Sequence, residues 1–187
     1  MRSLSLPLRT ERLVLRPHRP DDAQALLRFQ SRPDVARHLL EGPWDIGVAR
    51  ARVAERIPRT GLDTERRALA LVLEAADDGA VVGDIALWLP DSEELTAEIG
   101  WTLGPEHGGR GYATEAARIL RVAFEEYGLH RVKAEMDARN DASARLASRL
   151  GMRREAHFVR DSRSKGEWTG TFVYGILDDE LGVPCAH

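Results

Sequence analysis

The chain has 187 residues, of which 43% are hydrophobic and 30% charged, the balance of an ordinary soluble globular protein. Its formal net charge of -3 gives no electrostatic reason to expect nucleic acid as the main partner. No segment approaches the roughly 20 apolar residues that span a bilayer, and no signal-peptide core opens the sequence. The single cysteine, Cys185, cannot form an internal disulfide, which fits a reducing compartment. We therefore expect a cytoplasmic protein that binds neither membrane nor nucleic acid.

The first third of the chain predicts one strand and two helices. Leu13–Leu15 is a short apolar run between arginines and is typical of a strand. Asp21 is a candidate N-cap for a helix that Pro33 ends. A second helix is expected to begin near Asp45 and to end at Pro58 and Gly61.

The middle of the chain changes to the period of strands. Ala68–Leu73 and Val81–Leu89 are apolar runs separated by Asp77-Asp78-Gly79, a strong hairpin signal. Leu95–Leu103 is a third such run, and the glycine-rich loop Gly104–Gly111 follows it. An antiparallel meander that leads into this loop is expected.

The last third alternates helices and strands. Thr114–Tyr127 has the clearest helical spacing of apolar residues, and Arg131–Asp137 is typical of a strand. A helix from Asn140 to Leu150 precedes two final strands, roughly Met152–Arg163 and Thr171–Leu177.

This order predicts an α/β (α+β mixed) fold. The strand–loop–helix–strand unit from Leu95 to Asp137 should be a parallel crossover, and the hairpin-linked strands should be antiparallel. We expect a central mixed, mostly antiparallel sheet of about seven strands flanked by about four helices. Because no repeat or linker interrupts the pattern, residues 1–187 are interpreted as a single domain with its core at about residues 10–177.

The segment Gly104–Thr114 joins a strand directly to a helix and is suited to bind phosphate. Glycines let the backbone turn several N–H groups toward one point, and the start of a helix adds unpaired N–H groups and partial positive charge. Arg110 is placed to contact a further phosphate. The alternative is a glycine-rich turn that only connects the two elements.

Two other phosphate-binding motifs compete for this loop. A Walker A loop needs Lys and then Ser or Thr after its last glycine, whereas Gly104–Gly109 continues with Arg110. A dinucleotide fingerprint begins at Gly109-Arg110-Gly111, but Thr114 replaces its third glycine. Glu135 or Asp137 can imitate the acid of that fingerprint, so the alternative stays open, although only one crossover is evident.

In this setting the loop resembles motif A of the GNAT superfamily of acyl-CoA N-acyltransferases, Gln/Arg-x-x-Gly-x-Gly/Ala, at Gly108–Ala113. The longer string Gly111–Ala116 resembles the RimJ/RimL branch, which acetylates protein N-termini and small amines. Gly108 departs from the pattern, since it stands where Gln or Arg is usual. This departure removes a side chain but keeps the backbone donors. Further segments resemble the family in the same order: Thr10–Pro17, Ala97–Leu103, Asn140–Ser143 with Leu150–Met152, and Gly166–Trp168 with Tyr174.

The resemblance implies an acetyl-CoA-dependent N-acetyltransferase that needs no metal and forms no acyl-enzyme. Its cradle for the cofactor pyrophosphate would be Gly108–Thr114. The family's splayed strands 4 and 5 would be Leu95–Leu103 and Arg131–Asp137, with pantetheine in the gap. The cofactor-binding residues that it implies are Trp101, Thr102, Leu103, Gly109, Arg110, Gly111, Tyr112, Ala113, Thr114 and Asn140.

The same resemblance assigns the acid–base groups. Glu98 is the first candidate for the general base that the protonated amine requires, with Glu135 and Asp137 as weaker candidates. Ser143 is the candidate that protonates the departing thiolate, with Tyr174 as an alternative. On the residues alone, an exposed strand carboxylate and a first-turn serine with only local bonds explain Glu98 and Ser143 equally well.

Several functional alternatives follow from the same residues. The acceptor is a small-molecule amine or a protein N-terminus, and the early helices and the Ser164–Trp168 loop line its side in relatives. A catalytically silent acyl-CoA sensor, or a dinucleotide-binding protein, would use the same loop without acetyl transfer. The sequence does not distinguish a monomer from a homodimer.

Overall fold

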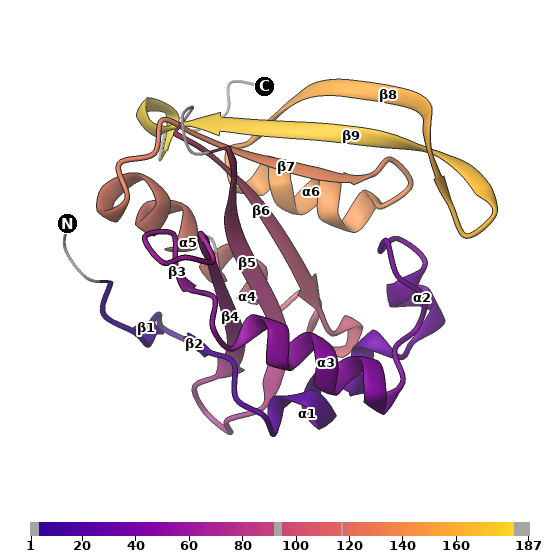
Figure 1. Ribbon diagram of the computed structural model, residues 1–187. Helices are drawn as coiled ribbons and strands as arrows, with labels where there is room; N and C mark the ends of the chain where they lie inside the picture. Colours follow the sequence, from indigo (N-terminus) through magenta and orange to yellow (C-terminus); the bar gives the residue numbers. More distant parts are fainter. Residues whose placement is uncertain (1–3, 92–94, 117, 182–187) are drawn as a thin grey trace.

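A computed structural model of the chain describes residues 4–91, 95–116 and 118–181 (Figure 1). Cys185 and residue 117 of the helix expected at Thr114–Tyr127 lie outside these residues. Within them, nine strands form one sheet in the order β1-β2-β4-β5-β6-β7-β9-β8, and β3 pairs with β4. The strands are β1 (Leu8–Arg9), β2 (Leu13–Pro17), β3 (Thr60–Gly61), β4 (Ala68–Ala75), β5 (Val81–Asp91), β6 (Thr96–Leu103), β7 (Arg131–Asp137), β8 (Arg153–Ser164) and β9 (Glu167–Leu177).

Helices cover both faces of the sheet. They are α1 (Asp22–Gln30), α2 (Pro33–Ala36), α3 (Ile46–Arg56), α4 (Tyr112–Ala116), α5 (Arg118–Arg121) and α6 (Asp141–Arg149), with a π-helical turn at Val122–Glu126 and 3₁₀ turns at Pro105–His107 and Asp178–Glu180. Apolar residues of α4, α5 and α6 join the main core, whereas α1 and α3 form a second cluster with Trp44.

Strand β4 shows why both faces need cover. Leu69, Leu71 and Leu73 enter the main core, while Ala70 and Val72 alternate with them and are buried as well. A strand with apolar residues at every position is stable only between two layers, and the helices supply them. The antiparallel meander predicted here is confirmed, and its turn passes through Gly79, at φ +73°.

Strands β6 and β7 are parallel, as the sequence predicts, and the pairing between them stops early. The paired positions run only from Thr96↔Arg131 to Glu98↔Lys133. Beyond Glu98 the two strands diverge, while β6 stays paired with β5 and β7 with β9. The expected splay of the fourth and fifth long strands is therefore confirmed, and it opens a gap in the middle of the sheet.

Three local expectations need correction. The sheet has more strands than expected, because β1 and β3 are two-residue strands too short to leave a periodic signal. Asp21 makes no capping bond to α1; instead Oδ2 of Asp22 accepts a hydrogen bond from the Arg19 N–H, 2.6 Å away. The helix after the glycine loop begins at Tyr112, two residues earlier than expected.

Candidate functional site

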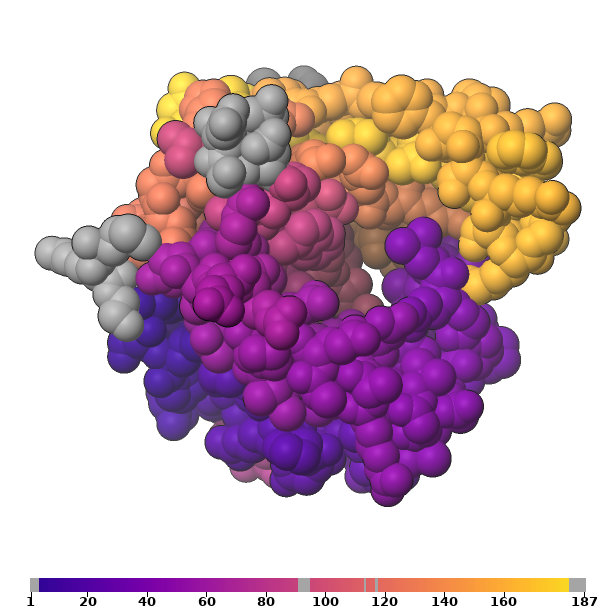
Figure 2. All heavy atoms as spheres, in the orientation of Figure 1, coloured from indigo at the N-terminus to yellow at the C-terminus, as the bar shows by residue number. Residues whose placement is uncertain are grey.

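A cavity of about 540 Å³ lies where β6 and β7 diverge. Figure 2 shows a hollow between the β8–β9 hairpin and the purple segment that carries α2. The cavity extends from the start of α6, past β6, to the residues of α3 on the other side of the sheet. It therefore connects the two faces through the gap between the strands.

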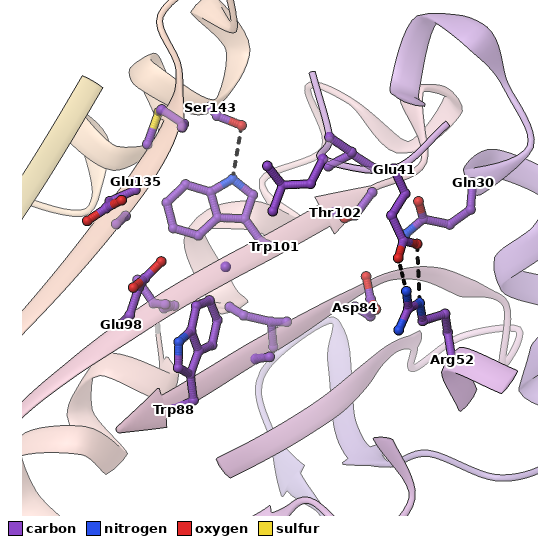
Figure 3. A pocket seen from close by; sticks show the side chains of 18 of the residues that line it. Gln30, Glu41, Arg52, Asp84, Trp88, Glu98, Trp101, Thr102, Glu135 and Ser143 are labelled. Carbon is purple, nitrogen blue, oxygen red and sulfur yellow. Dashed lines mark hydrogen bonds and ion pairs between the residues drawn. The ribbon is translucent and has the colours of Figure 1, made fainter. Parts of the chain in front are cut away.

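Trp101 and Ser143 meet across this gap. Trp101 lies on β6 beyond the last residue paired with β7, and its indole Nε1–H donates to the Ser143 Oγ, 3.3 Å away (Figure 3). Asn140 caps α6, because its Oδ1 accepts from the Ser143 N–H at 3.1 Å. The helix cap thus fixes the serine backbone, and the indole occupies one acceptor position of its hydroxyl. The hydroxyl proton remains free to be donated.

Three charged side chains gather at the last paired position of β6 and β7. Lys133 Nζ lies 2.8 Å from Glu135 Oε1 and 3.5 Å from Glu98 Oε2. Burial raises the pKa of Glu98 above its ordinary value; Lys133 opposes this shift and Glu135 adds to it. Glu98 and Glu135 both line the cavity. A carboxylate with a raised pKa is suited to accept a proton near neutral pH.

The opposite end of the cavity is polar and held together by ion pairs. Arg52 joins Glu41 to Glu55, and the Trp44 Nε1–H donates to Glu41 at 3.0 Å. Figure 3 places Gln30, Glu41 and Arg52 at this end, away from Glu98 and Ser143. No local pattern in the sequence indicates this cluster, since its members come from α1, α3 and the loop between α2 and α3.

The Arg56–Asp84 ion pair also lines the cavity. Asp84 lies on β5 and its side chain is almost fully buried. Arg56 therefore ties the end of α3 to the sheet and fixes that helix beside the cavity.

Lys165 ties the β8–β9 turn to the end of α2 and to the segment that follows it. Its Nζ donates to the carbonyl oxygens of Ala36 and Leu39, at 2.5 and 2.6 Å. Leu39 lines the cavity. The predicted acceptor-side loop Ser164–Trp168 does not itself line the cavity, but its lysine holds the loop that does.

The glycine loop lies outside the cavity lining, at the end of β6. Gly109 and Gly111 have φ of +76° and +78°, a conformation that other residues rarely adopt. In the described part of the chain, no main-chain acceptor is found for the N–H groups of Arg110, Gly111 and Tyr112. A row of unpaired N–H groups in a left-handed turn fits an anion, so the loop meets the requirements of a pyrophosphate cradle.

The predicted site residues fall into two groups. Glu98, Trp101, Thr102, Asn140 and Ser143 line the cavity. Leu103 ends β6 opposite Gly83, and Gly109–Thr114 form the loop and the first turn of α4.

The two secondary candidates lie elsewhere. Asp137 is bonded to Arg139, and Tyr174 is buried in the main core; neither lines the cavity. Of the two weaker base candidates, Glu135 lines the cavity and Asp137 does not.

Two further properties concern the described residues. Among them, no group of three or more His, Cys, Asp and Glu side chains is placed to hold a metal ion. None of the helices in the same ranges combines the length and apolar character that crossing a bilayer requires.

Comparisons with known proteins agree with the fold. Residues 12–153 match the acetyltransferase (GNAT) domain family. YnaD of Bacillus subtilis (strain 168), described as an uncharacterized N-acetyltransferase, is 33% identical over 91% of this chain and 96% of its own length. The crystal structure of a GNAT-family acetyltransferase from Bacillus anthracis has a TM-score of 0.82 at 28% identity, over 92% of this chain and 99% of that one.

The chain belongs to the GNAT acetyltransferase family and is an acetyltransferase enzyme. The sheet also argues against the alternative that the chain is a dinucleotide-binding protein. Among the described strands only β6 and β7 are parallel, whereas a dinucleotide-binding fold needs several parallel crossovers.

Proposed function

We propose that the chain transfers an acetyl group from acetyl-CoA directly to a primary amine, in a ternary complex at the gap between β6 and β7. One observation carries this proposal: a single cavity brings Glu98 and Ser143 together from the two sides of that gap. Acetyl-CoA supplies the activated acetyl thioester. The residues of the chain bind it, position the amine and move the proton.

Glu98 acts on the amine in this proposal. An α-amino group has a pKa of about 8 and a lysine amine about 10.4, so both are largely protonated at neutral pH. Glu98 accepts a proton from the ammonium group, directly or through one water, and the neutral amine then attacks the thioester carbon. As the C–N bond forms and the C–S bond breaks, the second amine proton ends on the departing sulfur. Burial raises the pKa of Glu98 and so makes its carboxylate a better proton acceptor than an exposed glutamate.

Ser143 acts on the leaving group. A thiol with a pKa of about 8.5 is a stronger acid than a serine hydroxyl, so full proton transfer from serine to thiolate is unfavourable. We therefore assign Ser143 a hydrogen bond to the sulfur as the C–S bond breaks, rather than the proton transfer expected from the sequence. The Trp101 indole supports this role, because its N–H takes an acceptor position on Oγ and leaves the hydroxyl proton to donate.

The donor is held mainly by backbone groups. The N–H groups of the loop at Gly109–Thr114 bind the pyrophosphate, with Arg110 as the side-chain contribution. Main-chain groups of Trp101–Leu103, freed by the early end of the β6–β7 ladder, bind the pantetheine together with Asn140.

Charge favours a cationic acceptor. The cavity is lined by five carboxylates, Glu41, Glu55, Asp84, Glu98 and Glu135, against the arginines Arg52, Arg56 and Arg59. This acidic excess attracts a protonated amine, which then loses its proton next to Glu98.

The acceptor that we propose is a small primary amine or a protein N-terminus. The resemblance to the RimJ/RimL branch supports the N-terminus. So does the partial similarity to YdaF of Bacillus subtilis, a candidate ribosomal N-acetyltransferase, at 31% identity over 54% of this chain and 51% of that one.

Release of free thiol from acetyl-CoA in the presence of an amine panel tests the proposal. The panel contains small mono- and diamines and peptides with free N-termini. We expect turnover with at least one class, and Glu98→Gln and Ser143→Ala should each lower kcat by roughly 10²-fold while coenzyme A binding persists.

Glu125→Gln is the matched control, because this exposed carboxylate lies on the π-helical turn Val122–Glu126 and outside the cavity lining. Tight binding of acetyl-CoA without turnover across the panel would favour a sensor. Full activity in both site variants would overturn the two assigned roles.

A further inference from the structure

The opening segment Thr10–Arg12 packs against the glycine loop, although the two lie far apart in the chain. Arg12 and Glu115 are 103 residues apart, yet the Arg12 N–H donates to Glu115 Oε2 at 2.9 Å. The same oxygen accepts from Thr10 Oγ1, and the other carboxylate oxygen accepts from Arg12 Nε. One carboxylate thus takes three donors from a single segment, and the proposed acetyl transfer makes no use of these contacts.

Arg12 also contacts the loop itself. Its Nη1 donates to the carbonyl oxygen of Arg110, 2.6 Å away. A Cβ built on Gly111 would lie 2.7 Å from Arg12 Nη2, so the guanidinium occupies the space beside the glycine. Any other residue at position 111 would have to displace Arg12 as well as adopt a strained φ.

The contact with Arg110 orients a peptide group of the cradle. The carbonyl of Arg110 and the N–H of Gly111 belong to the same peptide plane, and in a trans peptide they point in opposite directions. Because Arg12 holds the carbonyl on its own side, the Gly111 N–H points to the other side of the loop. This N–H is one of the donors without a main-chain acceptor in the described part of the chain.

The pair also controls charge next to the loop. Burial opposes ionisation of Glu115, but the donors from Thr10 and Arg12 outweigh it and hold its pKa below the ordinary value. The carboxylate is therefore ionised at neutral pH. Without Arg12, this unpaired negative charge would lie four residues from Gly111 and repel a phosphate.

We propose that Arg12, held by Glu115, is a positioning residue for the donor: it orients the Arg110–Gly111 peptide toward the diphosphate of an acyl-CoA and neutralises Glu115. This inference rests on the proposed function, since it presumes that the loop binds an acyl-CoA. The pair acts before any chemistry, so its effect belongs to donor binding rather than to acetyl transfer.

Calorimetric titration with coenzyme A tests the inference without turnover. Arg12→Met should weaken coenzyme A binding about tenfold, which corresponds to roughly 1.4 kcal/mol. In the acetyl-transfer assay, the KM for acetyl-CoA should rise while kcat and the amine KM stay unchanged. Arg50→Met is the matched control, because it removes the same charge from an exposed arginine outside the cavity lining.

A double-mutant cycle separates a joint role from two independent ones. Glu115→Gln should also weaken coenzyme A binding, because Arg12 loses the group that holds it. Adding Glu115→Gln to Arg12→Met should instead recover part of the affinity, because it removes the unpaired negative charge beside the loop. Arg12→Lys should recover part of the affinity, since an ammonium replaces the charge but not both directed bonds.

The outcomes distinguish a failure of this inference from a failure of the proposed function on which it rests. If the unmodified chain binds no coenzyme A, the proposed function falls and the inference with it. If it binds, but Arg12→Met and Arg50→Met both bind within twofold of it, only the inference is overturned. Should Arg12→Met fail to fold, Arg12→Lys and Glu115→Gln carry the same comparison.

Discussion

At the scale of single residues, Lys133 is the cation closest to Glu98. Its charge lowers the pKa of Glu98 against the effect of burial. In Lys133→Met that opposition disappears, so the pKa of Glu98 rises further. The base then stays protonated to higher pH, and the acidic limb of the kcat/KM profile should move to higher pH. The measurement is kcat/KM for the amine across the pH range.

Two variants make this prediction decisive. Lys133→Arg keeps the charge and should leave the limb close to its original position. Glu98→Gln removes the titrating group and should abolish the limb. A profile that Lys133→Met leaves unmoved would show that Glu98 is not the group that titrates.

At the scale of elements, Arg16 joins β2 to α1 through a buried ion pair. Its Nη1 and Nη2 donate to the two carboxylate oxygens of Asp22, at 2.9 and 2.7 Å, and its Nε donates to Glu74 on β4 at 2.6 Å. Only 8% of the Arg16 side chain and 4% of the Asp22 side chain are exposed. Arg16→Met leaves the Asp22 charge buried and unpaired, so the free energy of unfolding should fall by about 3–5 kcal/mol.

Urea denaturation measures this loss. Arg32→Met is the control, because Arg32 forms the same kind of bidentate pair with Asp34 on the surface, where water screens it. Its unfolding midpoint should hardly change. Equal midpoints for the two variants would mean that β2 and α1 do not depend on the buried pair.

The elements also show what the sequence can and cannot predict. The turn at Gly79, the cap at Asn140 and the parallel crossover depend on neighbours in the chain, and each was predicted. The Arg12–Glu115 contact depends on two segments that only the folded sheet brings together, so no local pattern indicates it. The same holds for Glu41 and Arg52, which join the site from a loop and a helix. The roles of Glu98 and Ser143 stay predictions.

At the scale of the whole molecule, Lys165 connects the C-terminal hairpin to the N-terminal loop that lines the end of the cavity that we assign to the acceptor. Lys165→Met keeps the stem but loses both hydrogen bonds, so that loop should become more mobile. We expect kcat/KM to rise severalfold for wide acceptors, such as lysines on a folded protein, relative to a peptide N-terminus.

The comparison needs acetylation rates for both kinds of acceptor with the same preparation. Arg163→Met on the same hairpin serves as control, since this exposed arginine makes no contact with the loop in the described residues. An unchanged ratio in Lys165→Met would show that the bridge does not restrict the acceptor.

The early end of the β6–β7 ladder has an evolutionary consequence. Under the proposed function, the donor side of the gap offers backbone groups, which every residue carries, so we expect most substitutions along Ile99–Leu103 to leave those groups in place. The acceptor side is built from side chains such as Glu41, Arg52 and Asp84, where one substitution changes the chemistry. A lineage with this architecture can exchange its acceptor by a few mutations and keep its donor throughout. Under the proposed function, we therefore expect relatives with one third of their residues in common to share a fold and a donor while acting on different amines.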